Sequence, residues 1–167
     1  IRHTTHERVF LMEEGIVSSI QQNMPLEEIK SIYQSSCESA LHQAISENEQ
    51  RLKMFGLSGN ELFRDTFPLV FDEFSERASH VYQFGKKLNV WGSMLWKQLT
   101  PKIIAELKIV SEKLGLTGIV DRIEAYETGF VPIELKTGKS PREGVWPGHR
   151  IQLTCYALLL EEHFKKD

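Results

Sequence analysis

The hydrophobic pattern of the chain changes near Pro101, and this change limits the folds that it can adopt. Before Pro101, apolar residues recur mostly at the three- and four-residue spacing of amphipathic helices. After it come short runs rich in β-branched residues, which favour strands, and then a helical pattern. This order predicts a mixed α/β fold with a small central mixed sheet, flanked by helices and preceded by a large N-terminal helical region. The strands are expected over about 103–110, 117–126 and 130–136, and the last helix over about 149–164.

The helical region is expected to hold three stretches. The first begins near Thr5 or His6, because Thr4 and Glu7 have the spacing of a capping box. The length of 167 residues fits one domain over 1–167, with a helical part over about 1–100 and a sheet core over about 101–167. The other helical stretches are expected over about 26–55 and 61–99, with interruptions at Pro68 and Gly85.

Composition narrows the classes of partner. The chain carries 20 basic and 23 acidic side chains, a net charge of −3, so a nucleic-acid partner would need a local basic patch. No run approaches the roughly 20 apolar residues of a membrane span. We therefore expect a cytoplasmic protein without a membrane partner. Cys37 and Cys155 are far apart, and two thiols cannot supply a four-thiolate metal or iron–sulfur site.

Asp121 is the first candidate for chemistry. It lies in Gly118-Ile-Val-Asp121, and on a strand it would share a face with Thr117, Ile119 and Ile123. That face is mostly apolar, and an unpaired carboxylate there would be costly. A bound metal ion would offset the cost.

The next strand carries Pro132-Ile-Glu-Leu-Lys136. Glu134 and Lys136 are two residues apart and would project from one face, one hairpin away from Asp121. Asp121 and Glu134 would hold a hard divalent cation that activates a water for phosphodiester cleavage, and Lys136 would position that water or offset charge on phosphorus. The alternative is an ordinary salt-bridged hairpin, because Glu-x-Lys is common.

Two further groups of polar residues lie on helices. Gln152 and Tyr156 share a helix face, with His149 one turn earlier, so they either line the site or form a solvated edge. His6, in the first helix, is either a metal ligand through a neutral ring nitrogen or an exposed histidine. The sequence leaves open whether His3 or His6 is the ligand.

These residues together resemble the motifs of the PD-(D/E)XK superfamily, in particular its RecB-like exonucleases. The likeness is closest to the CRISPR-associated exonucleases numbered as family four, and it extends over nearly the whole chain in the family's order. The motifs are His6-Glu7, Gly118-Ile-Val-Asp121, Glu134-Leu-Lys136 and Gln152-Leu-Thr-Cys-Tyr156.

The resemblance implies roles for these residues. It implies Mg²⁺ or Mn²⁺ as the cofactor, bound by His6, Asp121, Glu134 and the Leu135 carbonyl. Lys136 would be catalytic together with both carboxylates, and Gln152 and Tyr156 would be accessory to the reaction. The CRISPR-associated relatives usually also hold a [4Fe-4S] cluster, but neither cysteine of this chain matches a cluster position, so only a longer chain could supply its ligands.

The loop before the last helix forms a local basic patch in this acidic protein. It offers phosphate contacts and one aromatic ring that can stack on a base, although a solvated loop would have the same composition. The candidate DNA-binding residues are Lys139, Arg142, Trp146, His149 and Arg150.

The resulting hypothesis is a metal-dependent DNA exonuclease that prefers single strands or ends. The CRISPR resemblance implies trimming of DNA before spacer integration, with the CRISPR integrase as partner. A RecB-type repair or helicase-associated nuclease would use the same chemistry. The alternative from another class is a nuclease-fold module that binds DNA without cutting it; the retained Asp121, Glu134 and Lys136 speak against it. The sequence does not specify the oligomeric state.

Overall fold

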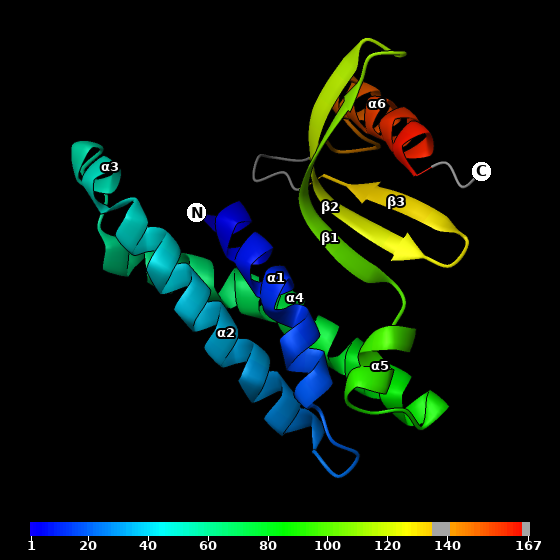
Figure 1. Cartoon of the computed structure of the whole chain (residues 1–167). Coiled ribbons are helices and arrows are strands. Elements are labelled where there is room, and N and C mark those ends of the chain that lie inside the picture. The colour runs from blue at the N-terminus through cyan, green and yellow to red at the C-terminus, as the bar shows by residue number, and fades with distance from the viewer. Residues whose placement is uncertain (135–140, 165–167) are drawn as a thin grey trace. The chain divides into compact units, whose positions relative to one another are not determined.

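The computed structural model describes residues 1–134 and 141–164, which form two compact units, Ile1–Leu99 and Thr100–Asp167 (Figure 1). The first unit is helical, and the second combines a sheet with a helix. This confirms the mixed α/β class, and the boundary lies where the sequence changes its pattern. That both units act as one nuclease domain stays a prediction.

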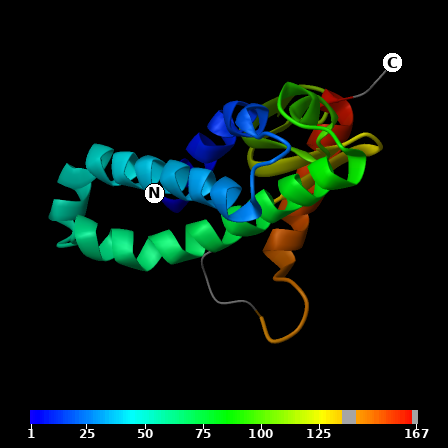
Figure 2. The same ribbon diagram turned by 90° about the horizontal axis from the view of Figure 1, so that it is seen from below.

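The helical unit is built around two long helices that lie side by side and run in opposite directions (Figure 2). α1 packs against both of them and against α5. Its core is made of fully buried apolar side chains, among them Val9, Val17, Tyr33, Phe74 and Val81. The helices are α1 (Arg2–Ser19), α2 (Leu26–Glu47), α3 (Glu49–Met54), α4 (Gly59–Leu88) and α5 (Ser93–Gln98).

Two expected helix breaks are wrong, because α4 continues through Pro68 and Gly85. Around Pro68, the rings of Phe63, Phe67 and Phe71 stack at four-residue intervals, with centroids 5.4 and 5.8 Å apart, and this packing supports the helix across the missing N–H. At Gly85, a Cβ would lie 3.0 Å from the Trp91 ring, so the glycine serves close packing. The helix ends instead at Asn89, whose φ of 53° is left-handed.

The start of α1 also differs from the expectation. The helix begins at Arg2, and Thr4 and Glu7 lie within its first turns instead of forming a capping box. The Thr5 hydroxyl donates back to the Ile1 carbonyl, a contact inside the helix that the capping spacing does not reveal.

A buried ionic group links three helices of this unit. Glu13 is fully buried, and its carboxylate accepts hydrogen bonds from the Tyr33 hydroxyl at 3.0 Å and from Arg77 Nε at 2.6 Å. A second Arg77 nitrogen donates to the other carboxylate oxygen at 3.1 Å, so the pairing is bidentate. Burial and the neighbouring Glu13 carboxylate raise the pKa of the Tyr33 hydroxyl well above its usual value, which keeps that hydroxyl a donor.

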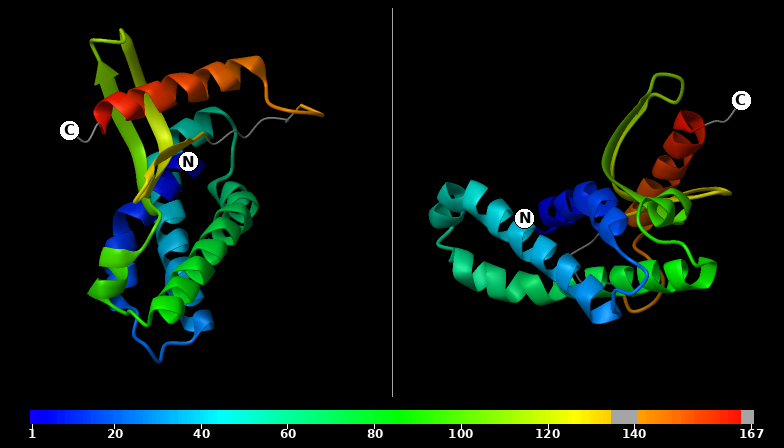
Figure 3. Two further views of the ribbon diagram at one scale, coloured as in Figure 1. Left: turned by 90° about the vertical axis from the view of Figure 1, so that its right-hand side faces the viewer. Right: turned by 60° about the horizontal axis from the view of Figure 1, so that its bottom comes forward.

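The sheet unit holds three antiparallel strands in the order β1-β2-β3, joined by two hairpins. The sheet was expected to be mixed, but the described strands are all antiparallel. α6 packs across one face of this sheet (Figure 3). Its core joins Val120 and Ile123 to Leu159 and Leu160. The elements are β1 (Lys102–Ser111), β2 (Leu116–Tyr126), β3 (Gly129–Ile133) and α6 (Pro147–His163).

β3 is shorter than expected, since it ends at Ile133. Glu134 therefore lies just past the strand, so the expectation that a strand orients Glu134 is wrong. Leu135 and Lys136 lie outside the described residues. None of the helices in the described part of the chain has the length and apolar character needed to cross a membrane.

We predict that Arg77→Met costs about 3–5 kcal/mol of unfolding free energy, because it leaves the Glu13 carboxylate buried without its guanidinium. Urea unfolding followed by helical circular dichroism measures this. Lys53→Met is the matched control: its ion pair with Glu49 is exposed and screened by water, so its removal should change the stability far less. Equal costs for both variants would contradict a structural role for the buried group.

Candidate active site on the sheet

Two acidic residues pair across β1 and β2, and a third follows the end of β3. In the β1–β2 register, Ala105 pairs with Arg122 and Leu107 with Val120, so Glu106 stands opposite Asp121. In the β2–β3 register, the last pair is Arg122 with Ile133, and one further step brings Glu134 to the other side of Asp121. Asp121 therefore occupies the middle position between two other carboxylates.

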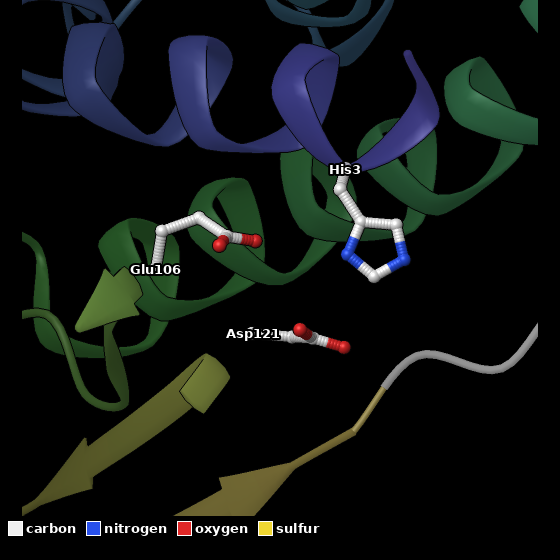
Figure 4. A group of neighbouring side chains, drawn as sticks. All are labelled: His3, Glu106 and Asp121. Atoms are coloured by element: carbon white, nitrogen blue, oxygen red, sulfur yellow. The ribbon is translucent and has the colours of Figure 1, made fainter. Parts of the chain in front are cut away.

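Glu106 and Asp121 project from adjacent strands (Figure 4). A carboxylate oxygen of Glu106 lies within 4.8 Å of one of Asp121. Both residues and Glu134 are half-buried, so water screens their charges less than it would at the surface. Sequence reasoning did not identify Glu106 as a site residue, because its position beside Asp121 follows only from the strand register.

The backbone is distorted at this point of the sheet. Glu106 has a φ of 51°, a left-handed conformation that residues other than glycine seldom adopt. The register is the same before and after it, so no residue is inserted and the distortion is a local twist. Such conformations cluster at functional sites, where the surrounding structure holds them in place.

The burial pattern of β2 differs from the face that was expected for Asp121. Thr117 and Ile119 are exposed, whereas Ile123 is fully buried. The buried residues Val120 and Ile123 are three positions apart, so the two-residue alternation of β2 shifts at Asp121. Asp121 therefore does not continue an apolar face; it lies where the strand changes the side that it buries.

α6 holds the site residues through a chain of hydrogen bonds. The Gln152 side-chain amide donates to Glu134 Oε1 and to the Tyr156 hydroxyl, both at 2.9 Å. The Tyr156 hydroxyl in turn donates to the Ile119 carbonyl of β2 at 2.8 Å. Gln152 and Tyr156 thus point toward the sheet, as the active-site interpretation expects, and they connect Glu134 to the strand that carries Asp121.

Gly118 makes this contact between helix and strand possible. A Cβ there would lie 2.8 Å from Cε1 of the Tyr156 ring, closer than real Cβ contacts come. The glycine of the Gly118-Ile-Val-Asp121 motif is therefore needed for packing rather than for a turn. Sequence reasoning gave Gly118 no role, because its neighbour lies 38 positions away in the chain.

His6 is engaged within the helical unit. Its Nδ1 lies 2.8 Å from the Arg2 carbonyl and its Nε2 lies 3.0 Å from Glu73 Oε2. The hydrogen bond from His6, with the charges of His6 and Arg2, lowers the pKa of Glu73 to about 2, so Glu73 is a carboxylate. Both ring nitrogens of His6 thus lie beside oxygen atoms of its own helical unit.

The predicted DNA-binding residues lie partly among the described residues and partly outside them. Lys139 lies outside the described residues, with Leu135 and Lys136. Arg142, Trp146 and Arg150 are exposed, and His149 is half-buried in the first turn of α6. Both cysteines are free, and burial raises the pKa of the Cys37 thiol to about 12, which makes it unreactive.

The donors of the sheet suit a hard divalent cation. Carboxylate oxygens are the ligands that Mg²⁺ and Mn²⁺ prefer, and Asp121 on β2 and Glu134, the residue that follows β3, offer them. The only thiol described in this unit is Cys155, on α6, so a thiolate site for a softer metal is not formed by the described residues.

Comparison with known proteins agrees with this chemistry. Residues 22–167 match the model of the PD-(D/E)XK nuclease superfamily. A "CRISPR-associated exonuclease Cas4" of Francisella tularensis subsp. novicida is 40% identical over 60 residues, 36% of this chain and 29% of the relative. A "CRISPR-associated exonuclease Cas4/endonuclease Cas1 fusion" of Myxococcus xanthus is 43% identical over 63 residues, 35% of this chain and 11% of the relative.

These matches are partial. A further "CRISPR-associated exonuclease Cas4", from Rhodospirillum rubrum, is 41% identical over 59 residues, which is 34% of this chain and 18% of the relative. The matched segment thus spans less than a third of each of these relatives. No solved structure matches the chain at a significant level.

We predict that Gly118→Ala destabilises the sheet unit by about 1–3 kcal/mol, because the new methyl group overlaps the buried Tyr156 ring. The measurement is chemical unfolding, with Gly148→Ala as control, since a Cβ at Gly148 meets nothing within 4 Å. Combined with Tyr156→Leu, the cost of Gly118→Ala should shrink. Strictly additive costs would contradict a direct clash.

Proposed function

The chain belongs to the PD-(D/E)XK nuclease superfamily, and from that premise we propose that it is a metal-dependent deoxyribonuclease acting as an exonuclease on single strands or DNA ends. The observation that carries this proposal is the alignment of Asp121 and Glu134 across the β2–β3 hairpin, with Gln152 bonded to Glu134. In an ordinary salt-bridged hairpin, no hydrogen bond from a helix such as the one from Gln152 would be expected at the acidic residue.

The site residues would divide the work between them. Asp121, Glu134 and the Leu135 carbonyl would hold Mg²⁺ or Mn²⁺. When bound, such a cation polarises a phosphodiester and makes water a better nucleophile. Lys136 would orient the attacking water and offset the negative charge that develops on the phosphate.

The two residues of α6 have a positioning role in this mechanism. Gln152 donates to Glu134 Oε1 and thereby limits the rotation of that carboxylate. Tyr156 holds Gln152 and anchors the group to the Ile119 carbonyl of β2. The spacing between Glu134 and Asp121 would thus be set before DNA arrives, which lowers the cost of reaching the reactive geometry.

The DNA strand would approach along the start of α6. Arg142 and Arg150 are exposed and can contact phosphates, and Trp146 exposes 47% of its surface, enough to stack on a base. Lys139 and His149 would add to this surface. Because stacking and phosphate contacts are tolerant of sequence, we expect little preference among bases.

We further propose a role in trimming DNA before spacer integration in CRISPR systems, with the integrase as partner. The support is the names of the relatives, of which some join exonuclease Cas4 to endonuclease Cas1 in one chain. Repair by a RecB-type nuclease would require the same site chemistry.

We propose His3 rather than His6 as the histidine ligand that the family motif implies. His3 lies in the first turn of α1 and is half-buried, whereas His6 is 4% exposed and has both ring nitrogens directed at acceptors within the helical unit. A ring nitrogen that contacts a neighbouring oxygen must leave that contact before it can bind a metal.

We predict that wild-type protein cuts end-labelled single-stranded DNA in Mg²⁺ or Mn²⁺ and not in EDTA. Glu134→Ala and Lys136→Ala should each lower the rate at least 100-fold, because each removes a group on which the reaction depends. Glu127→Ala, in the β2–β3 turn, is the control and should keep the wild-type rate.

The same substrates separate the alternatives. Strong cutting of a closed circular single strand would contradict exonuclease action. DNA binding without cutting by metal-loaded wild type would favour a non-catalytic binding module.

We predict that His3→Ala weakens Mn²⁺ binding about 10-fold or more in isothermal titration calorimetry, and that His6→Gln leaves the affinity within about twofold of wild type. Circular dichroism checks that both variants are folded. The opposite pattern, with His6→Gln the weaker binder, would show that His6 leaves its contacts to reach the ion.

A further inference from the structure

Glu106 is the carboxylate of the aligned row to which the proposed mechanism gives no role. It lies on β1, directly opposite Asp121 in the strand register. Glu134 lies on the other side of Asp121, after β3. We propose that Glu106 is a further ligand of the divalent cation, so that Asp121 is flanked by metal-binding carboxylates on both sides. This inference rests on the proposed function, because it adds a residue to the metal site that the family implies.

The distances allow one cation to join the two side chains. Oxygen ligands of Mg²⁺ or Mn²⁺ lie about 2.1 Å from the ion, which places two such oxygens about 3 to 4 Å apart. The Glu106 and Asp121 oxygens already lie within 4.8 Å of each other, and Glu106 has three side-chain torsions with which to close the difference (Figure 4). No movement of the strands is required.

Electrostatics favours a cation at the same point. Like charges directly opposite each other on neighbouring strands destabilise a sheet, and half-burial of both carboxylates strengthens their repulsion. A shared divalent cation would turn this repulsion into attraction.

A third carboxylate would change which ions the site prefers. Three oxygen donors with three negative charges raise the affinity for small hard dications and add nothing for soft metals, which favour sulfur. The site would also hold its ion in the absence of DNA, whereas sites with few protein ligands depend on substrate phosphates to complete the coordination. Metal binding by the free protein therefore tests the inference without any activity measurement.

The experiment is calorimetric titration of Mn²⁺ into the full chain after EDTA treatment, comparing wild type, Glu106→Gln and the control Glu127→Gln. Glu127 lies in the β2–β3 turn, six residues beyond Asp121, and its change removes the same charge. We expect Glu106→Gln to bind Mn²⁺ about 10-fold more weakly or worse and Glu127→Gln to bind as wild type does.

Thermal unfolding with and without Mn²⁺ provides a second readout. The Tm of each protein without metal serves as its own reference. With Mn²⁺, the gain in Tm of Glu106→Gln should be smaller than that of wild type. Equal Mn²⁺ affinity in both proteins, or an equal gain in Tm, would overturn the inference and leave the proposed function in place.

If Glu106→Gln fails to fold, the Mn²⁺ affinity of Glu106→Asp tests the proposal instead. It keeps the charge but draws the oxygens back by one methylene, so weaker Mn²⁺ binding is expected and unchanged affinity would overturn the proposal. The proposed function is judged separately, on whether wild-type protein cuts DNA in the presence of metal. Metal binding that depends on Glu106 without any cutting would therefore reject the function and retain the site.

Discussion

The register of the antiparallel sheet is the constraint on which the site depends. Asp121 lies in the middle strand, so one register fixes its neighbour on β1 and another fixes its neighbour after β3. A slip of one residue in either hairpin would turn the neighbouring carboxylate to the other face of the sheet. Two features hold these registers: the short turn between Tyr126 and Gly129, and the burial of Val120 and Ile123. The geometry of the site therefore depends on the same contacts that stabilise the sheet.

α6 provides what the strands alone do not. Glu134 lies just past the end of β3, where ladder hydrogen bonds no longer fix the backbone, and Gln152 supplies the missing restraint from the helix. That restraint depends on Tyr156 reaching the Ile119 carbonyl, which depends on the absence of a side chain at Gly118. The segments that contain Gly118, Glu134 and Gln152 are separate in the sequence, but their side chains and backbone are connected by these contacts. This explains why a residue without any chemical group can be as necessary as a catalytic one.

The sequence revealed the features that repeat at regular spacing and those carried by a motif. Helical periodicity and β-branched runs located the three described strands and most helices, and the motif order led to the proposal of Asp121, Glu134, Gln152 and Tyr156 as site residues. Sequence patterns gave wrong or missing predictions where a contact between residues far apart in the chain determines the local structure. Pro68 predicted a break that aromatic stacking prevents. Glu106 was expected only as part of a strand and not as a site residue, because Asp121, its neighbour in the fold, is 15 residues away in the sequence.

The histidine illustrates the same limit at the level of chemistry. His6 stands in the position that the motif resemblance favours, yet motif spacing says nothing about what surrounds a ring. In the helical unit a carbonyl and a carboxylate occupy both of its nitrogens, and the lowered pKa of Glu73 keeps that partner charged. Arg2 and Glu73 provide these contacts, and both lie outside the motif on which the resemblance rests. A ring nitrogen that contacts a neighbouring oxygen must leave that contact before it can bind a metal. Motif order alone therefore does not tell which histidine can act as a ligand, because the local packing of α1 and α4 also bears on it.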